Sequence, residues 1–567
     1  MAEYLSPGVY VEEYDNSPRS VEGVGTSTAG FVGMAEKGPV EGIPQLVTNF
    51  KSFTQQFGGF LSEFAYGENR FLANSVEQFF ANGGTRCFVM RVAPADAESA
   101  SAEKGIITVT AKNPGVWGNK IQITLNTVKK QRLQLIAKSE TGYVAKSVDG
   151  FREGDLVVFE GTYTRIRTIF DRTVTFEDEL PKEVVDDSII PKALLYLVTV
   201  DMGVRYGDDA ENYTELSFNP SSPRFISARL ANSELVDIKV DALTETGNPV
   251  EAIFGEGNES GAFFLDGGSD GSIASVNAAT FIGEDRGPGR RTGLQAFLEN
   301  NIVSMIGIPG ITIPEVIVAL VSHCENTRSR FAVIDMPADM TKTNDLINYR
   351  GIIDSTYAAM YHPWIQVFDR SSNKADFIPP SGAVMGVYSR TDINRGVHKA
   401  PANETVFCTG LKVNYTKGEQ DILNPEGINL IRALPGQGIR VWGARTASSN
   451  SSFKYVNVRR LFIFVEESIK ANTNWVVFEP NDSSLWLRVQ LSISGFLDGL
   501  WRNGMLAGDS PETSYFVEIG PSTMTRDDIM NGRLICNIGI APSRPAEFVI
   551  FRLTQYTAEA GGGGEEG

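Results

Sequence analysis

The chain has 567 residues, with 51 lysine or arginine side chains against 69 aspartate or glutamate side chains, for a net charge of −18. This acidity makes duplex DNA and anionic membranes unfavourable direct partners. A hydrophobic content of 42% with 21% charged residues excludes an intrinsically disordered chain. No apolar run reaches the roughly 18 residues that a membrane helix needs, and the first residues predict no secretory signal. A chain of this length is expected to form about two to four domains.

The first 95 residues divide into an extended segment and an α/β segment. Residues 1–25 contain a break at Pro7-Gly8 and a short β-like run, but no helical periodicity. Downstream, the pattern predicts strands over 29–32 and 87–92 and a helix over about 68–81, which the Asn-Gly-Gly sequence after it would end.

Residues 96–264 have a different character. They contain short β-like runs between turn signals, which is the pattern of a β-sandwich or barrel, and residues 133–196 predict a smaller barrel nested inside. Their 18 basic and 27 acidic side chains hold −9 of the net charge. An all-β block between α/β blocks is typical of an inserted domain, and its charge predicts that it is the most solvated part of the chain.

The second half returns to α/β texture. A continuous apolar run over 302–308, a helix that begins at Pro314 and strands over 331–336 and 365–368 predict βαβ units. Two long helices follow, over about 455–472 and 484–503. We therefore expect an α/β and α+β multidomain protein. The expected segments are an N-terminal arm (1–25), the first part of an α/β core (26–95), the β-rich insert (96–264), a middle α/β domain (265–400), a C-terminal core domain (401–541) and a C-terminal arm with a tail (542–567).

Catalytic and metal chemistry receive little support from the sequence. There is no phosphate-binding loop, and the three histidines and four scattered cysteines form no metal-ligand spacing, so no cofactor or metal is predicted. Asp335, His362 and Ser381 occur in the order found in subtilisin-type proteases, but Ser381 is not in a nucleophile-elbow motif. A serine hydrolase with these three residues is kept as an alternative.

Both ends of the chain contain a short apolar strand beyond a proline-containing break. These strands lie at 9–11 and 548–553. A terminal apolar strand promotes aggregation unless it joins a sheet. It can join its own domain, or it can extend a sheet of a neighbouring subunit and so build a polymer.

Several sequence blocks resemble the contractile phage tail sheath family, which includes phage tails, R-type bacteriocins and related contractile injection systems. The blocks are SPGVYVEE (6–13), TAGFVG (28–33), EKGP (36–39), FFANGG (79–84), NPGVWGN (113–119), PPSGAV (379–384), APAN (400–403), LNPEGIN (423–429), VWGART (441–446), YVNVRRL (455–461) and FEPN (478–481). They occur in order over nearly the whole chain, and the nested barrel is the part least similar to the family.

The resemblance implies a structural role. Family members stack as hexameric rings around an inner tube, assemble on a baseplate up to a tail terminator, and contract to drive the tube through a cell envelope. It implies that the middle α/β domain is a subtilisin-like domain with a structural function, and that the β insert lies on the outside. The expected location is a virion tail sheath or contractile injection particle that assembles in the bacterial host cytoplasm, without direct nucleic acid binding or membrane insertion.

Combined with the resemblance, the terminal strands predict inter-subunit arms. The N-terminal arm residues are Pro7, Gly8, Val9, Tyr10 and Val11, and the C-terminal arm residues are Phe548, Val549, Ile550, Phe551 and Leu553. The predicted receiving strand consists of Leu534, Ile535, Cys536, Asn537 and Ile538. Pro542 and Pro545 are expected on the hinge side of the second arm.

A basic edge is also predicted on the C-terminal core domain, where Arg459, Arg460 and Lys470 would face the tube; the alternative is that they have partners inside the subunit. A static tube or capsid protein remains a second alternative function, and contraction to a second length would distinguish a sheath from it.

Overall fold

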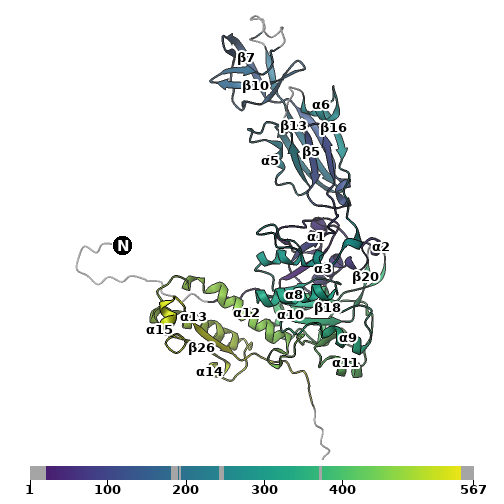
Figure 1. Ribbon diagram of the computed structural model, residues 1–567, viewed down its shortest axis with the longest axis vertical. Helices are drawn as coiled ribbons and strands as arrows, with labels where there is room; N and C mark the ends of the chain where they lie inside the picture. Colours follow the sequence, from purple (N-terminus) through teal and green to yellow (C-terminus); the bar gives the residue numbers. More distant parts are fainter. Residues whose placement is uncertain (1–20, 181–189, 191–192, 242–247, 370–372, 551–567) are drawn as a thin grey trace, which may run out of the picture.

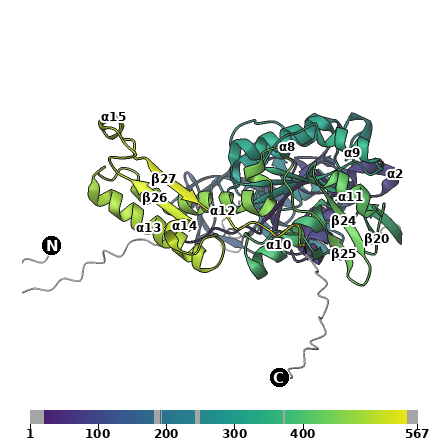
Figure 2. The ribbon, with the colours of Figure 1, turned by 90° about the horizontal axis from the view of Figure 1, so that it is seen from below.

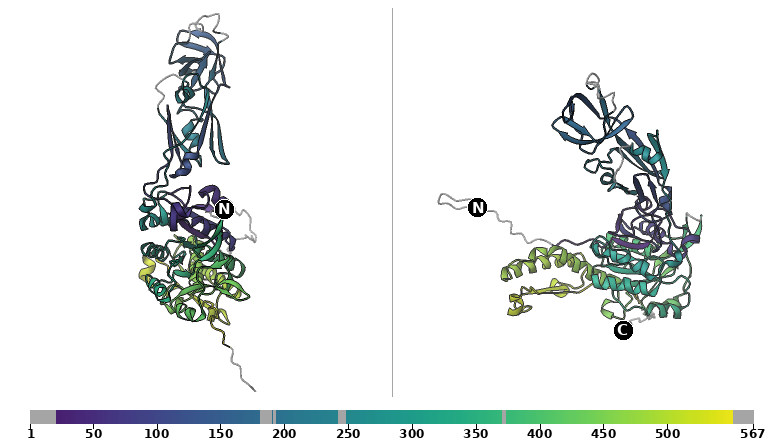
Figure 3. Two further views of the ribbon diagram at one scale, coloured as in Figure 1. Left: turned by 90° about the vertical axis from the view of Figure 1, so that its right-hand side faces the viewer. Right: turned by 45° about the horizontal axis from the view of Figure 1, so that its top comes forward.

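The computed structural model describes residues 21–180, 190, 193–241, 248–369 and 373–550. Figure 1 shows an elongated molecule: an α/β body, a column of β structure that rises from it, and a helix-rich part that projects sideways. Figure 3 shows the column standing on the body when the molecule is turned about the vertical axis. The molecule is therefore a mixed helix and sheet protein with several distinct parts.

The body is built on a nine-stranded sheet whose central strands are parallel. The strand order is β2-β3-β1-β17-β18-β19-β24-β25-β22. The strands are β1 (Ala29–Met34), β2 (Gln45–Val47), β3 (Cys87–Val92), β17 (Met305–Gly307), β18 (Phe331–Asp335), β19 (Ala358–His362), β22 (Glu404–Thr405), β24 (Ile428–Leu434) and β25 (Gly438–Val441). All residues of β1, β18 and β19 are buried, as expected for parallel strands that are covered on both faces.

Helices cover both faces of this sheet. Successive residues of β1 point to opposite sides, so Phe31 belongs to one hydrophobic core and Val32 to the other. The Phe31 side is covered by α1 (Phe50–Phe57), α3 (Leu72–Ala81) and α10 (Ser381–Arg395), and the Val32 side by α8 (Pro314–Thr327), α9 (Thr343–Arg350) and α11 (Lys417–Leu423). Short helices α2 (Glu63–Tyr66) and α7 (Ala278–Ile282) lie at its margins, and β20 (Ile365–Asp369), β21 (Lys374–Ile378) and β23 (Gly410–Leu411) form a small separate sheet.

Residues 101–264 form the β column. One sheet has the order β15-β5-β4 and a second has the order β14-β13-β6-β16. The strands are β4 (Ser101–Lys104), β5 (Ile107–Ala111), β6 (Gln122–Val128), β13 (Thr199–Tyr206), β14 (Asp209–Leu216), β15 (Val236–Val240) and β16 (Ser260–Phe264), with helices α5 (Ile226–Leu230) and α6 (Pro249–Phe254). Alternating burial along β5 and β6 places one face of each in a shared core.

A closed barrel lies at the far end of the column. Its strands have the order β10-β11-β8-β7-β12-β9. They are β7 (Arg132–Ser139), β8 (Gly142–Ala145), β9 (Leu156–Phe159), β10 (Thr162–Phe170), β11 (Thr173–Phe176) and β12 (Leu194–Leu197). The barrel has its own hydrophobic core, which includes Leu133, Val157 and Ile166.

The part that projects sideways contains the last described elements. These are α12 (Val456–Asn472), α13 (Ser483–Arg502), α14 (Pro511–Ser514), α15 (Arg526–Met530), β26 (Tyr515–Ile519) and β27 (Cys536–Ile540). Figure 2 shows α13, β26 and β27 together on one side of the body. Leu461, Leu485, Val489 and Val517 share a fifth core there, so the two long helices and the small sheet form one packed unit.

The structure corrects two expectations about the body. β24 pairs in parallel with β19, so the body sheet continues to Val441, across the expected division at 400/401. Among the described residues, β20 pairs only with β21 and β23, both antiparallel, and is not a strand of a βαβ unit. Both expectations were wrong because the sequence of a short apolar strand does not indicate which sheet the strand joins.

Close contact between α3 and α10 depends on a small residue. A Cβ atom on Gly382 would lie 2.2 Å from the backbone oxygen of Ser75, which cannot move independently of its helix. We expect Gly382→Ala to lower the free energy of unfolding by about 1–3 kcal/mol, because an extra methyl group overpacks this contact. Gly495→Ala is the matched control, since a Cβ there meets nothing within 4 Å. Thermal unfolding of both variants measures the effect, and equal melting temperatures would contradict it.

Candidate functional site

The residues of the possible hydrolase triad are buried in the body and do not form a relay. The backbone N–H of Ser381 donates to Oδ1 of Asp335 at 2.7 Å, and its hydroxyl donates to Oδ2 at 2.6 Å. The imidazole Nε2 of His362 instead lies 3.0 Å from the hydroxyl of Tyr415. Ser381 is thus hydrogen-bonded directly to Asp335. His362, which would have to accept the serine proton in a hydrolase triad, is hydrogen-bonded to Tyr415 instead.

Burial also shifts the pKa values of Asp335 and His362. Burial raises the pKa of Asp335 to about 6, although hydrogen bonds from Ser381 and Gly310 act in the opposite direction. Burial, with a smaller contribution from Lys412, lowers the pKa of His362 to about 4. The cluster therefore joins the end of β18 to the start of α10 by buried hydrogen bonds, which is a packing role.

We expect a fluorophosphonate probe to leave Ser381 unlabelled, because its hydroxyl is fully buried and donates to Asp335. Mass spectrometry of the intact protein after prolonged incubation measures this. The Ser381→Ala variant serves as the control for labelling elsewhere. Stoichiometric labelling that Ser381→Ala abolishes would contradict the packing role and support the hydrolase alternative.

Within the residues that the structure describes, no three His, Cys, Asp or Glu side chains lie close enough together to hold a metal ion. No described helix is both long and apolar enough to cross a membrane.

The last residues of the predicted N-terminal arm (1–25) are fixed along α12. The predicted arm residues Pro7, Gly8, Val9, Tyr10 and Val11 lie outside the described residues. Beyond them, the N–H of Val24 donates to Oγ of Ser468 at 3.1 Å. Nδ2 of Asn472 donates to the carbonyl oxygen of Glu22 at 2.9 Å. The described chain therefore begins beside the C-terminal end of α12.

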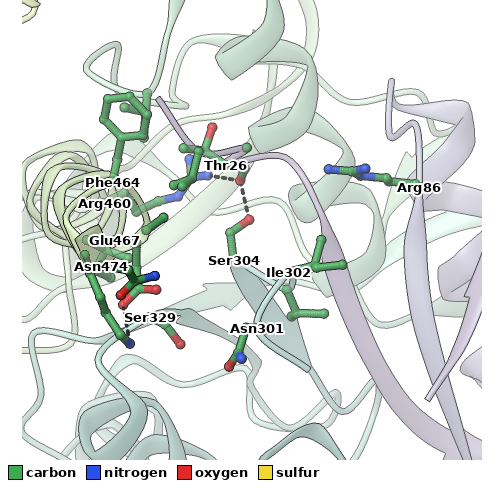
Figure 4. Close-up of a pocket in the computed structure, with 17 residues that line it drawn as sticks. Thr26, Arg86, Asn301, Ile302, Ser304, Ser329, Arg460, Phe464, Glu467 and Asn474 are labelled. Carbon is green, nitrogen blue, oxygen red and sulfur yellow. Dashed lines mark hydrogen bonds and ion pairs between the residues drawn. The ribbon is translucent and has the colours of Figure 1, made fainter. Parts of the chain in front are cut away.

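A buried ion pair lies deeper along the same segment. Arg460 and Asp392 are 2.6 Å apart, and each side chain is only 3% exposed. Thr26 joins both, since its hydroxyl donates to Asp392 at 2.7 Å and its carbonyl oxygen accepts from Arg460 at 2.9 Å. Figure 4 shows Thr26 beside Arg460 and Ser304 at a cavity of about 440 Å³, between α12 and the body.

These contacts correct the predicted basic edge at two of its three residues. Arg460 is paired with Asp392, and the guanidinium of Arg459 lies 3.6 Å from the ring centroid of Phe453. Both arginines are buried, so neither presents a charge on the surface of the subunit. Lys470 differs: its side chain is 71% exposed, and its amine lies 3.3 Å from a carboxylate oxygen of Glu467 on the same helix.

The predicted receiving strand has an open edge in the subunit. Cys536, Asn537 and Ile538 belong to β27, whereas Leu534 and Ile535 precede it. Among the described residues, β27 pairs only with β26, in antiparallel register from Tyr515↔Ile540 to Ile519↔Cys536. Because a strand has two edges, the outer edge of β27 retains backbone groups without a sheet partner. A further strand can add there.

The predicted C-terminal arm leaves the body directly after Glu547. Phe548, Val549 and Ile550 are 72%, 68% and 79% exposed and form no regular secondary structure, while Phe551 and Leu553 lie outside the described residues. Three consecutive large apolar side chains at the surface form a patch that a partner could cover.

Glu547 forms the last side-chain anchor of this segment among the described residues. Its carboxylate accepts from Nε and a terminal nitrogen of Arg445 at 2.7 and 2.8 Å, from Tyr455 at 2.8 Å and from Asn424 at 2.8 Å. Burial by itself raises the pKa of Glu547, but these hydrogen bonds outweigh it and lower the pKa to about 2. Pro542 and Pro545 lie before this anchor, so they do not mark the start of the arm. Nothing in the sequence indicated the anchor, because Glu547 and Arg445 are 102 residues apart.

Comparisons with known proteins show which proteins this chain resembles. Residues 287–447 match the phage tail sheath protein central domain, and residues 448–555 match the phage tail sheath C-terminal domain. A putative prophage major tail sheath protein of Pseudomonas aeruginosa is 24% identical over 290 residues, which cover 49% of this chain and 72% of the relative. The tail sheath protein of Burkholderia phage BcepMu is 24% identical over 307 residues, 50% of this chain and 62% of that protein.

Solved structures show the same fold over almost the whole chain. The sheath of an extracellular contractile injection system in its contracted state has a TM-score of 0.53 at 22% identity, covering 98% of this chain and 99% of that one. A sheath tail protein from Listeria innocua has a TM-score of 0.53 at 13% identity, covering 92% and 96%.

Proposed function

Because this chain belongs to the contractile tail sheath family, we propose that it is a sheath subunit that polymerises as stacked hexameric rings around an inner tube and contracts to drive the tube through a target cell envelope. The observation that carries the proposal is the combination of an open edge on β27 with an exposed apolar segment that leaves the same subunit after Glu547. An open edge and a projecting segment that can pair as a strand are complementary surfaces on one chain. Copies of the chain can therefore form an open-ended polymer.

In this proposal the two arms extend the small sheet that contains β27 in neighbouring subunits: one arm pairs with the open edge of β27, and the other adds as a further strand of the same sheet. Backbone hydrogen bonds tie each arm to its receiving strand, and Phe548, Val549 and Ile550 become buried when the strand forms. The connections survive rotation of whole subunits, since the chain between arm and body can turn while the added strand stays paired. Such a mesh allows the polymer to change length without coming apart.

The proposal assigns each part of the chain a place in the polymer. The unit with α12, α13 and β27 lies toward the tube and the β column with the barrel lies on the outside, where its net charge of −9 is solvated. The body between them is the family's subtilisin-like domain in a structural role, which the direct Ser381–Asp335 hydrogen bonds favour. The domain limits of the sequence analysis stay proposals, with the body extended to Val441.

The proposed partners follow from the same assignment. They are further copies of this chain, the inner tube protein, the baseplate and the tail terminator, in a phage tail or contractile injection particle assembled in the bacterial host cytoplasm. A solved structure with the same fold is a baseplate of the anti-feeding prophage, which favours the baseplate among them. The subunit acts without enzymatic chemistry, cofactor, direct nucleic acid binding or membrane insertion.

We expect deletion of residues 1–14 to give a folded subunit that does not polymerise, because the deletion removes the first arm and leaves the described body intact. Sedimentation and electron microscopy measure polymer, and circular dichroism with thermal unfolding checks the fold. Deletion of residues 561–567 is the control, since it shortens the chain beyond both predicted strands. Sheaths of normal length from the first deletion would contradict the proposed arms.

Lys470 is the residue of the predicted basic edge that remains available for the tube. We expect Lys470→Glu to polymerise normally but to retain about three- to fivefold less tube protein, since it reverses one exposed charge per subunit. Lys51→Glu, an exposed residue of α1 in the body, is the matched control. Co-sedimentation with purified tube measures the ratio, and equal retention by both variants would remove Lys470 from the tube surface.

A static tube or capsid protein is the second candidate, favoured by the same open edge. Particles of one length only, before and after exposure to contraction-inducing conditions, would support it over a contractile sheath.

A further inference from the structure

We propose that α12 is the common anchor of both arms, and that Glu547 is the positioning residue that sets where the C-terminal arm leaves the body. This inference rests on the proposed function, because it assumes that the arms join neighbouring subunits. It adds a mechanical role for one helix. Force that one neighbouring subunit exerts on its arm is transmitted along α12 to the arm that the other neighbour binds.

The N-terminal chain is attached along the second half of α12. Ser468 accepts from Val24, and Asn472 donates to Glu22, near the helix C-terminus. Gly23 lies between these two contacts, and a Cβ atom there would be 2.8 Å from the ring of Phe464. The close approach and the two hydrogen bonds show that this segment lies directly on the helix.

The C-terminal chain is attached at the other end of α12. Tyr455, the residue before the helix, donates to Glu547, and Nδ2 of Asn457 donates to the carbonyl oxygen of Ser543 at 3.2 Å. Lys454 adds a charge 3.5 Å from the same carboxylate. The C-terminal chain is thus attached to α12 itself through Ser543. Glu547 is attached to Lys454 and Tyr455 directly before the helix, and to Arg445 and Asn424 of the body.

The helix is suited to carry a load between these points. Seventeen residues at 1.5 Å each make α12 about 25 Å long, and a helix changes length far less readily than a loop. The buried Arg460–Asp392 pair attaches the N-terminal part of the helix, between the two attachment points, to α10 of the body. A displacement of one arm root therefore moves the other root and the body together.

Glu547 determines the length of the flexible tether before the C-terminal arm. Without its carboxylate the next anchored residue upstream is Ser543, which is held by Asn457 and by the carbonyl oxygens of Met505 and Gly504. Four more residues would join the tether, which adds about 13 Å of reach. A longer flexible tether lowers the effective concentration of the arm at its receiving strand and weakens the transmission of force.

The test compares anchor variants that keep both arms complete. Glu547→Gln and the double variant Ser468→Ala/Asn472→Ala loosen one end each, and Glu315→Gln, an exposed glutamate of α8, is the matched control. The unassembled chains should melt within a few degrees of the parent. The concentration for half-maximal polymerisation should rise about three- to tenfold for each anchor variant and stay unchanged for the control.

A pH profile separates anchoring from general stabilisation. Hydrogen exchange of residues 541–550 in the unassembled chain should be faster in Glu547→Gln than in the parent. Because the pKa of Glu547 is lowered from 4.5 to about 2, the difference should be complete above about pH 4.5 and disappear as the pH falls toward 2. If Glu547→Gln does not fold, Tyr455→Phe, which removes one hydrogen bond of the anchor, replaces it.

The outcomes distinguish this inference from the proposed function. If the 1–14 deletion abolishes polymerisation but both anchor variants polymerise like the parent, the arms are real and α12 is not their anchor. Equal exchange of residues 541–550 in parent and Glu547→Gln at pH 6 would also overturn the inference. If the 1–14 deletion polymerises normally, the failure lies with the proposed function of the arms.

Discussion

The buried contact among Thr26, Asp392 and Arg460 joins parts of the chain that would otherwise be separate. Each residue comes from a different element: the N-terminal segment, α10 of the body, and α12. A buried ion pair adds little net stability over apolar packing, but removing one partner costs about 3–5 kcal/mol because the other charge stays buried. The geometry of a charged pair is also more specific than that of an apolar contact. The pair therefore fixes how the projecting unit, and with it the arm roots, is oriented on the body.

Sheet edges explain why this orientation matters. The nine-stranded sheet ends on β2 and β22, which are only three and two residues long, so its edges offer little to another strand. β26 and β27 have five residues each and form a sheet of two, which is rarely stable alone and here depends on α13. An added strand would stabilise this small sheet and bury its open edge. In the proposed polymer, the added strand would complete this two-stranded sheet.

Local sequence patterns predicted elements well where one chain segment determines the structure. Pro314 begins α8 as expected at a first helical position, and α12 and α13 lie within a residue or so of the expected ranges. The apolar run at 302–308 predicted a continuous buried strand, but Ile302 is 53% exposed and only Met305–Gly307 pairs as strand β17. Contacts between distant segments were not predictable. Arg459 and Arg460 look like a charged helix face in the sequence, whereas their partners, Phe453 and Asp392, place them inside the molecule. Glu547 likewise looks like an ordinary acidic residue until the fold brings Arg445 to it.

The uneven charge of the chain has a structural explanation in the way the β column is attached. The chain enters and leaves the column side by side: Glu98 pairs with Ser269, and Asp96 accepts from Ser272 and Ser275. A joint of this kind keeps the column upright on the body while leaving its surface exposed to water, as Figure 3 shows. The column and the part with β27 and α12 lie on different sides of the body, and salt screens charges over roughly 8–10 Å. In the proposed sheath, an acidic exterior would therefore repel other particles without weakening the proposed contacts between arms and sheets, so the two properties could vary independently in one chain.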